Sequence, residues 1–393
     1  MNILVIGNGF DLAHGLDTRY KDFLTVMNLY RELEYVDYLT QFDELTKFVK
    51  GKKLERIFKE DLTNAITGKE QDDAIIQLKN VKNDNFWMIY LNMLLDENLK
   101  KEKGWVDFEQ EIKRVVKKVN DAIDTFKENS EDDFAKQIPD KHITNALFTK
   151  GVAWTASYEE VISVLRDDLI IMTRCLEIYM ERFINRNVLD NIVNVRSEDI
   201  EEYNIDKVLS FNYTKTFELL YGTGKKIEYD YIHGKANISN TTETNNMVLG
   251  IDEFLPEDRK NVDLKFIEFK KYYQRIYKET GCNYRSWLDE IEDSNEQFDN
   301  QLEKCGEHPV HNVYIYGHSL DVTDGDVLRN LILTRNVYTT IFYHNKEAMG
   351  KEIANLVRII GQDELIKRTG GLDKTITFRK QRELKPLVPD TWY

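Results

Sequence analysis

The sequence predicts an α/β protein in which helices cover both faces of a parallel sheet and a large all-helical segment interrupts the sheet domain. Three observations support this prediction. The chain opens on a short apolar run that ends in Gly-x-Gly. A long central stretch then has apolar residues at three-and-four spacing, which is typical of helices. After about residue 205, β-favouring runs return and alternate with helical patterns.

The opening run, residues 2–6, has no polar alternation, which predicts a strand buried on both faces. Gly7 and Gly9 permit backbone angles and a close approach that a Cβ atom would block. Asn8 or Asp11 is suited to cap a helix that follows. A strand, a glycine turn and a helix N-terminus together form an anion-binding corner. The third glycine of the dinucleotide fingerprint is missing, so a plain tight turn remains the alternative.

The stretch between about residues 22 and 200 is predicted to be helical, because charged residues fill the gaps between regularly spaced apolar ones. The clearest helical patterns cover residues 22–30, 85–95, 105–112 and 161–183. Residues 47–84 are rich in lysine and acidic residues, which is typical of exposed helices or mobile connections.

Five later runs favour strands, and each ends in polar or glycine residues. They cover residues 207–212, 226–234, 247–252, 312–320 and 338–343. Alternation with helices predicts parallel strands, and such open sheets bind ligands outside the carboxyl ends of their strands. We therefore expect a Rossmann-like nucleotide-binding domain formed by residues 1–24 plus 205–372. A helical insertion domain would cover residues 25–204, and a C-terminal tail, 373–393, would supply an edge strand.

The composition narrows the class of partner. A formal net charge of −15 over 393 residues argues against a general nucleic-acid binder. The three cysteines, Cys175, Cys282 and Cys305, form no Cys-x-x-Cys pair, so neither a disulfide framework nor a cysteine zinc site is supported. No metal is expected. The chain has no signal-peptide pattern and no apolar stretch of transmembrane length, so we expect a soluble cytoplasmic protein without a membrane partner.

Several motifs occur together in this chain, namely Ile6-Gly-Asn-Gly-Phe-Asp-Leu-Ala-His-Gly-Leu16, Thr18-Arg-Tyr-Lys-Asp-Phe-Leu24, Trp105-Val-Asp-Phe-Glu109, Ser210-Phe-Asn-Tyr-Thr214, Ile232-His-Gly234 and Tyr316-Gly-His-Ser-Leu320. With this set of motifs the chain resembles the AbiH family of bacteriophage abortive-infection proteins. The similarity extends over nearly the whole chain. It implies a bacterial antiphage protein.

A more distant resemblance is to the sirtuin-like NAD-binding fold, including its NAD-hydrolysing antiphage branch. It implies that Asn212 lies near the nicotinamide ribose and that His233 is the general base. It further implies that NAD contacts two groups of residues after strands, namely Gly7, Asn8, Gly9 and Phe10, and Gly317, His318, Ser319 and Asp324. The chain departs from sirtuins because it has Phe-Asn-Tyr in the asparagine motif and lacks a four-cysteine zinc module. Protein deacylation is therefore not expected, whereas recognition or cleavage of NAD is.

The proposed roles agree with the chemistry of the reaction. Breaking the bond between nicotinamide and ribose develops oxocarbenium character, so the site needs a group that orients the ribose and a base that activates water or a hydroxyl. His233 titrates in a suitable pH range. Asn212 would hold a water or hydroxyl in line, and Asp11 would steady the developing positive charge.

Structural alternatives exist for each of these residues. His233 before Gly234 can be a hydrogen-bonded turn residue, and Asn212 can stabilise its own loop through a side-chain turn. His14 can be solvated or capping. Asp107 and Glu109 lie two residues apart, which on a helix points them to different faces. Capping is therefore the alternative to a carboxylate that reaches over the site from the helical insertion.

We expect an antiphage effector that binds NAD or a related nucleotide and hydrolyses the nicotinamide–ribose bond. One alternative is a nucleotide-sensing module without catalysis that gates a partner or self-assembly. The other is a nuclease-like toxin, against which the acidic charge argues. The expected partners are the nucleotide and a phage-derived trigger or partner defence protein, and formation of a homo-oligomer is left open.

Overall fold

The computed structural model describes residues 1–32, 50–51, 55–66, 73–81, 84–100, 107–126, 133–300, 308–372 and 374–386. The chain forms two compact units. Unit 1 comprises Met1–Leu16, Asn185–Lys235 and Thr280–Tyr393, and unit 2 comprises Asp17–Ile184 and Ala236–Glu279. This division differs from the expected boundaries. Residues 185–204 lie in the sheet unit, and residues 17–24 and 236–279 lie in the helical unit.

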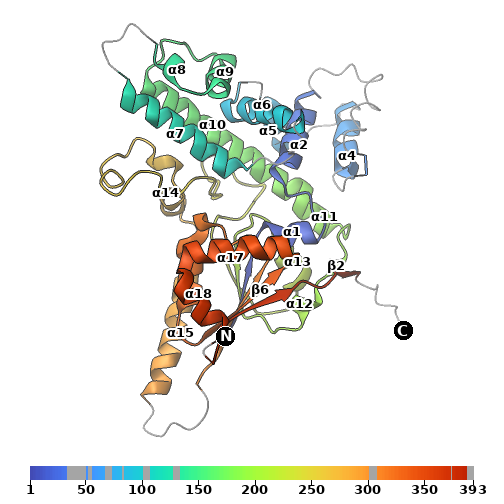
Figure 1. The fold of residues 1–393 in the computed structure, drawn as a ribbon. Coiled ribbons are helices and arrows are strands. Elements are labelled where there is room, and N and C mark those ends of the chain that lie inside the picture. Colours follow the sequence, from blue (N-terminus) through green and yellow to red (C-terminus); the bar gives the residue numbers. More distant parts are fainter. Residues whose placement is uncertain are drawn as a thin grey trace. The chain divides into compact units, whose positions relative to one another are not determined.

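A six-stranded parallel sheet is the centre of unit 1 (Figure 1). Its strands are β1 (Asn2–Ile6), β3 (Lys207–Ser210), β4 (Glu228–Tyr231), β5 (His311–Tyr316), β6 (Val337–Tyr343) and β7 (Ile376–Lys380). They lie in the order β4-β3-β1-β5-β6-β7, and every neighbouring pair is parallel. The chain runs outward from β1 through β3 and β4, and then returns to the other side of β1. This is the strand order of the doubly wound dinucleotide-binding fold, and it confirms the predicted α/β, Rossmann-like class.

Helices cover both faces of this sheet, as the opening apolar run predicts. They are α1 (Asn8–Ala13), α11 (Arg186–Leu189), α12 (Glu198–Glu201), α13 (Thr216–Tyr221), α15 (Tyr284–Asp299), α16 (Gly325–Leu333), α17 (Lys346–Ile360) and α18 (Gln362–Thr369). Successive strand residues point to opposite faces. Ile3 and Val5 join a core with Trp287 of α15. On the other face, the ring of Tyr316 packs edge-on against that of Phe10 in α1, with 6.0 Å between the centroids.

A short antiparallel strand pair and a 3-10 helix also belong to unit 1. β2 (Val195–Arg196) and β8 (Lys385–Pro386) form a separate antiparallel pair. The 3-10 helix η3 (Val322–Asp324) precedes α16. β7 lies at one edge of the main sheet, within the segment for which an edge strand was expected.

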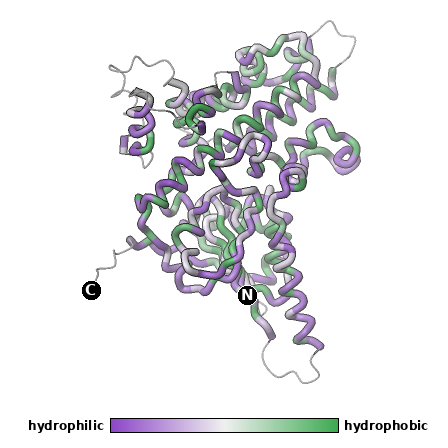
Figure 2. Tube along the Cα trace, turned by 180° about the vertical axis from the view of Figure 1, so that it is seen from behind, coloured by the Kyte–Doolittle hydropathy of each residue, from purple (hydrophilic) through white to green (hydrophobic). Residues whose placement is uncertain are grey.

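Unit 2 is helical. Its elements are α2 (Tyr20–Glu32), α4 (Glu55–Ile66), α5 (Asp73–Asn80), α6 (Phe86–Lys100), α7 (Phe108–Thr125), α8 (Phe134–Gln137), α9 (Lys141–Lys150), α10 (Tyr158–Tyr179), η2 (Ile267–Phe269) and α14 (Lys271–Tyr277). A π-helix, η1 (Met180–Asn185), continues α10. The long helices carry hydrophobic and hydrophilic residues in alternation (Figure 2), as their sequence periodicity predicts. Of the helices described, none combines the length and apolarity that crossing a membrane requires.

One predicted strand is wrong. Residues 247–252 form no strand, although Ile251 makes an isolated bridge with Lys270. The side-chain amide of Gln274 replaces a neighbouring strand. Leu249 N–H donates to Gln274 Oε1 at 3.0 Å, and Gln274 Nε2 donates to the carbonyl oxygen of Leu249 at 3.1 Å.

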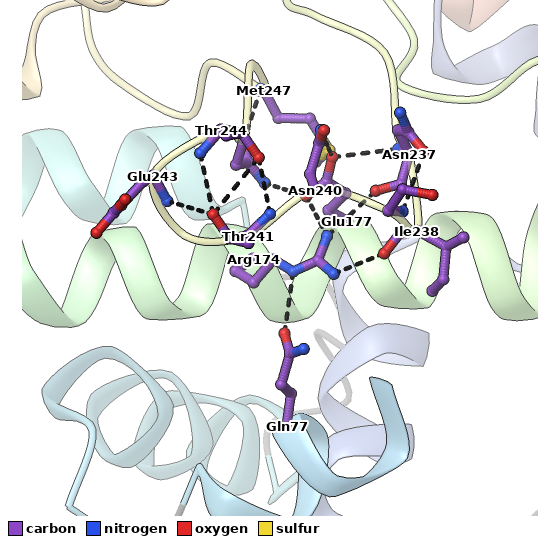
Figure 3. Close-up of polar contacts among 12 residues, drawn as sticks. Gln77, Arg174, Glu177, Asn237, Ile238, Asn240, Thr241, Glu243, Thr244 and Met247 are labelled. Atoms are coloured by element: carbon purple, nitrogen blue, oxygen red, sulfur yellow. Dashed lines mark hydrogen bonds and ion pairs between the residues drawn. The ribbon is translucent and has the colours of Figure 1, made fainter. Parts of the chain in front are cut away.

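A buried ion pair on α10 fastens the adjoining loop of unit 2 (Figure 3). Arg174 Nη1 lies 2.6 Å from Glu177 Oε2, and both side chains are at least 97 % buried, with 3 % and 0 % exposed. The Glu177 carboxylate also accepts hydrogen bonds from Asn237 N–H, Asn240 Nδ2 and Asn245 Nδ2. Arg174 donates in turn to the carbonyl oxygens of residues 237 and 238. The two buried charges of Arg174 and Glu177 neutralise each other, and their remaining hydrogen bonds go to residues 237–245. This loop is therefore held by polar contacts as well as by apolar packing.

Candidate functional site

The predicted site residues lie in the segments that follow four neighbouring strands of unit 1 at their carboxyl edge, some in loops and some in α1 and η3. Gly7 follows β1, Asn212 follows β3, His233 follows β4 and Gly317 follows β5. The order of the sheet reverses at β1, which lies between β3 and β5. In open α/β sheets, ligands bind outside the carboxyl edge at such a reversal point.

The glycines let two of these loops pack backbone to backbone. Gly9 N–H donates to the carbonyl oxygen of Gly317 at 2.7 Å. A Cβ atom on Gly9 would lie 2.7 Å from that oxygen, and one on Gly7 would lie 2.8 Å from the Cα atom of His318. Gly317 has a φ of +68°, and a Cβ there would lie 2.1 Å from the nitrogen of Phe10. The glycines therefore have a packing role, and their contact with a pyrophosphate stays a prediction.

The first helix contains both residues that were predicted to cap it. α1 starts at Asn8 with Gly7 as N-cap, and no side chain caps it, so the predicted capping by Asn8 or Asp11 is wrong. The extended backbone of Gly7 turns directly into the helix. The N–H groups of Gly7 and Phe10 donate to the carbonyl oxygens of Tyr316 and Gly7, at 3.4 and 2.9 Å. These donors are thus used within the loop in this structure.

We call the carboxyl edge of strands β4, β3, β1 and β5, with the segments that follow them, the rim. Phe10 and His14 belong to a buried aromatic cluster beside it. The Phe10 ring is 0 % exposed and lies 4.4 Å from the imidazole of His14, centroid to centroid. His14 Nδ1 donates to the carbonyl oxygen of Phe10 at 2.7 Å, and its Nε2 accepts from the hydroxyl of Tyr221 at 2.8 Å. Ser197 N–H donates to that same hydroxyl. His14 is therefore buried and structural, neither solvated nor a free cap.

Asn212 ties the loop after β3 to the loop after β1. Its Nδ2 donates to the carbonyl oxygen of Gly7 at 2.9 Å. Its backbone N–H donates to Ser210 Oγ at 3.1 Å. The alternative that its side chain merely stabilises its own loop is wrong, because the amide reaches a residue 205 positions away.

Asp11 makes a second tie between the same loops. Thr214 Oγ1 donates to Asp11 Oδ2 at 2.6 Å. Burial raises the pKa of the Asp11 carboxyl to about 6, although the hydroxyl groups of Thr214 and Thr216 oppose this shift. The side chain is 0 % exposed. Direct contact of this carboxyl with a substrate stays a prediction.

His233 and His318 share one carboxylate. His233 Nε2 lies 3.0 Å from Asp324 Oδ1, and His318 Nε2 lies 3.4 Å from Asp324 Oδ2. His318 Nδ1 accepts a hydrogen bond of 2.9 Å from the backbone N–H of Leu320. The ring of Phe211 packs edge-on against both imidazoles, at centroid distances of 5.5 and 4.3 Å. His233 is thus more than a turn residue, since its partner lies 91 positions away.

These polar groups are largely covered. His233, Asn212, His318 and Asp324 are 4 %, 6 %, 6 % and 7 % exposed. Asn8 and Ser319 are exposed at the same rim. Asn8 and Ser319 are thus accessible from solvent at this rim, whereas both imidazoles are buried.

The family model of bacteriophage abortive infection AbiH matches residues 3–344 of the chain. The chain belongs to the AbiH family. The family implies a role in abortive infection by phage. No curated protein and no solved structure matches the chain significantly.

Two polar residues of this AbiH protein that sequence reasoning missed lie on α17. Asn355 Nδ2 donates to the carbonyl oxygen of Ser319 at 3.0 Å. Glu352, one turn earlier on the helix, is 8 % exposed, and burial raises the pKa of its carboxyl to about 7. The apolar residues Leu356, Ile359 and Ile360 share this inner face. The helical spacing of these residues predicts an apolar residue at position 352. The glutamate found there was therefore a recognisable exception in the sequence.

The Trp-x-Asp-x-Glu motif of the AbiH resemblance has structural roles in unit 2. Asp107 is the N-cap of α7, and its Oδ1 accepts from the N–H groups of Glu109 and Gln110. The capping alternative is therefore confirmed. Glu109 Oε2 lies 2.7 Å from Nζ of Lys271, which is 3 % exposed. Trp105 lies outside the described residues. In the described ranges, no three His, Cys, Asp or Glu side chains are grouped so as to hold a metal ion.

Proposed function

We propose that this AbiH protein binds an adenine dinucleotide, with NAD as its substrate, and hydrolyses the bond between nicotinamide and ribose. One observation carries the proposal. An imidazole held by a carboxylate, His233 with Asp324, lies with Asn212 at the carboxyl edge of a sheet that has dinucleotide-binding strand order.

The binding part of the proposal rests on the rim. The loops after β1 and β5 flank the reversal point of the sheet, where a dinucleotide lies across the strands in this fold class. Asn8 and Ser319 present polar side chains there to phosphate or ribose oxygens. Gly7, Gly9 and Gly317 have no side chain, which lets the segments after β1 and β5 pack closely against each other.

The catalytic part assigns one role to each of two residues. Water attacks the C1′ carbon of the ribose, the C1′–N bond breaks, and its electron pair leaves with nicotinamide. His233 takes the proton from the attacking water, so that the products are nicotinamide, ADP-ribose and a proton. Asn212 orients the water or a ribose hydroxyl through its side-chain carbonyl, while its Nδ2 donates to Gly7.

Burial of the reactive groups fits an effector that is inactive at rest. With His233 only 4 % exposed, a substrate reaches it only in an open minority state. The apparent activity falls with the population of that state. A phage-derived trigger that binds the open state would raise turnover, and the loss of NAD would stop growth of the infected cell.

The test is nicotinamide release from NAD, measured by chromatography on the purified protein and on lysates of phage-infected cells that express it. His233→Gln and Asn212→Ala should abolish release. His308→Gln is the matched control, because His308 is more exposed and binds Asp299 away from the rim. Unchanged release in both rim variants, or intact NAD in infected cells that are otherwise protected, would reject the proposal.

A second candidate is a nucleotide sensor without catalysis, and the burial of His233 and Asn212 is the observation that favours it. In that case NAD would raise the melting temperature of the protein and be recovered intact. A ligand that binds only the native state stabilises it by RT ln(1 + [L]/Kd), so saturating NAD should shift melting by a few degrees. A nuclease-like toxin is not favoured by any observed contact.

A further inference from the structure

We propose that Asp324 and His318 are positioning residues that hold His233 in the Nε2–H tautomer, so that Nδ1 is the nitrogen that accepts a proton. The catalytic consequence rests on the proposed function. The assignment of the tautomer itself does not, because it follows from hydrogen bonds of the resting protein.

The backbone of Leu320 fixes the position of the proton on His318. Leu320 is fully buried and has a φ of +55°, a conformation that residues other than glycine seldom adopt. Its N–H donates to Nδ1 of His318, two residues earlier. A neutral imidazole has one N–H and one lone pair. The backbone therefore fixes the lone pair of His318 on Nδ1 and its proton on Nε2, the atom that lies 3.4 Å from Asp324 Oδ2.

The carboxylate of Asp324 lies between His318 and His233. An ionised carboxylate only accepts hydrogen bonds. With Oδ2 of Asp324 facing the proton on His318, Oδ1 faces Nε2 of His233 at 3.0 Å. Nε2 of His233 must then donate, which places the lone pair of its neutral ring on Nδ1. Leu320 thus fixes the tautomer of His318, and Asp324, which contacts both rings, fixes the tautomer of His233.

Packing of the rings preserves this arrangement. Phe211 contacts both imidazoles edge-on, and it is 8 % exposed. A ring flip of His233 would exchange Nε2 for a carbon atom opposite Asp324 and lose the hydrogen bond. Phe211 precedes Asn212 in the chain, so the residue that packs against the base adjoins the residue proposed to orient the nucleophile.

In the proposed reaction, the O–H bond of water breaks as its proton passes to Nδ1 of His233. The resulting imidazolium keeps its Nε2–H bond to Asp324, which stabilises the new positive charge. A carboxylate that orients and stabilises a catalytic imidazole in this way, without taking the proton, is well established for hydrolase triads. His318 takes no proton in the reaction. It holds the second carboxylate oxygen.

The tautomer can be measured without substrate by long-range ¹H–¹⁵N NMR of histidine-labelled protein, with His233→Gln used to assign the signals. We expect His233 to have a protonated Nε2 and an unprotonated Nδ1. Asp324→Ala should give a mixture of tautomers. An Nδ1–H ring in the wild type would overturn the proposal, whatever the activity. The expected tautomer in a protein that leaves NAD intact would support the assignment and reject only the proposed function.

Kinetics separate positioning from folding. Asp324→Asn should lower kcat for NAD cleavage by about 100-fold or more while KM stays within about 3-fold, because general-base catalysis contributes on the order of 10² to 10⁴. His318→Asn places an amide oxygen near the Leu320 N–H but removes the donor to Asp324, and should lower kcat by about 10-fold. Asp326→Asn, an exposed residue in the first turn of α16, is the matched control and should keep wild-type kcat. Wild-type kcat in Asp324→Asn would overturn the proposal.

Discussion

The side-chain amide of Asn212 donates to the carbonyl oxygen of Gly7 at 2.9 Å, although the two residues are 205 positions apart. The bond joins the loops that follow β3 and β1, which are neighbours in the sheet. Thr214 and Asp11 join the same loops a second time. Asn212 thus has a structural role that is independent of any substrate, and tests of its function must take this into account.

Replacing Asn212 should therefore lower both stability and activity. Asn212→Ala removes one of the two donors to the carbonyl oxygen of Gly7, which keeps the N–H of Phe10. The loss of one such hydrogen bond typically costs about 0.5–1.5 kcal/mol in the free energy of unfolding. Urea denaturation followed by circular dichroism measures this loss. Asn330→Ala, an exposed position on α16, should change stability by less than about 0.5 kcal/mol. Equal stability of the two variants would contradict the role given to this hydrogen bond.

The contact between Gly9 and Gly317 predicts that a single methyl group is harmful. In Gly9→Ala the new Cβ would lie 2.7 Å from a backbone oxygen, so the loops must separate, at a cost of about 1–3 kcal/mol. Gly350→Ala makes the same chemical change in α17, where a Cβ meets nothing within 4 Å. There we expect a gain of about 0.5–1 kcal/mol, because alanine favours the helix. Thermal melting of the pair should give shifts of opposite sign.

The buried ion pair between Arg174 and Glu177 predicts that Glu177→Gln, which keeps the shape of the side chain, lowers the free energy of unfolding strongly. Glu177→Gln removes the charge that pairs with Arg174 and accepts from three asparagines, and leaves the guanidinium uncompensated in a buried place. Breaking a buried pair typically costs about 3–5 kcal/mol. Glu347→Gln, at an exposed pair with Lys351, should leave the unfolding midpoint unchanged. A comparable midpoint for both variants in urea would mean that the loop does not depend on Glu177.

Glu352 predicts a specific dependence of stability on pH. Burial raises the pKa of its carboxyl from 4.5 to about 7 in the folded protein. The folded state therefore binds a proton between these values that the unfolded state has released. The stabilisation from this group is complete below pH 4.5 and is lost as the pH rises through 7. In Glu352→Gln the free energy of unfolding should fall less between pH 5 and pH 8, by about 1–3 kcal/mol.

Urea titrations at pH 5 and pH 8 measure this difference. Glu364→Gln is the control, because the Glu364 carboxylate is paired with Arg368 and its pKa is lowered by that contact. This variant should keep the wild-type dependence over the same interval. An identical pH dependence in Glu352→Gln and the wild type would show that Glu352 does not titrate as its burial implies.

Local sequence patterns predicted most strands of the sheet but few of the contacts between segments that are distant in the sequence. The uniform apolar run of β1 predicts burial on both faces, because strand residues alternate in direction and both sets are apolar. Asp107 was recognisable as a cap, since capping depends on residues within one turn. The apolar run at residues 247–252 was wrongly predicted to be a strand. The backbone of Leu249 pairs with the side chain of Gln274, and the spacing of residues in the sequence does not indicate such a contact.

The candidate site shows the same division. Parallel strands place their carboxyl ends together, so the sequence predicted that residues after β1, β3, β4 and β5 share one rim. It did not predict that Asp324 would bridge His233 and His318. That contact depends on the geometry of η3 and on the unusual backbone angle of Leu320, which arise from tertiary packing.

The position of β1 has a consequence for how this protein is made. β1 leaves the ribosome before its two neighbours in the sheet, β3 and β5, which end at Ser210 and Tyr316. At ordinary translation rates the first neighbour follows on the order of 10–40 s later. Meanwhile the helices of unit 2, which form through local contacts, can fold. The apolar segment of β1 must therefore be shielded from aggregation in the nascent chain until β3 and β5 have been synthesised.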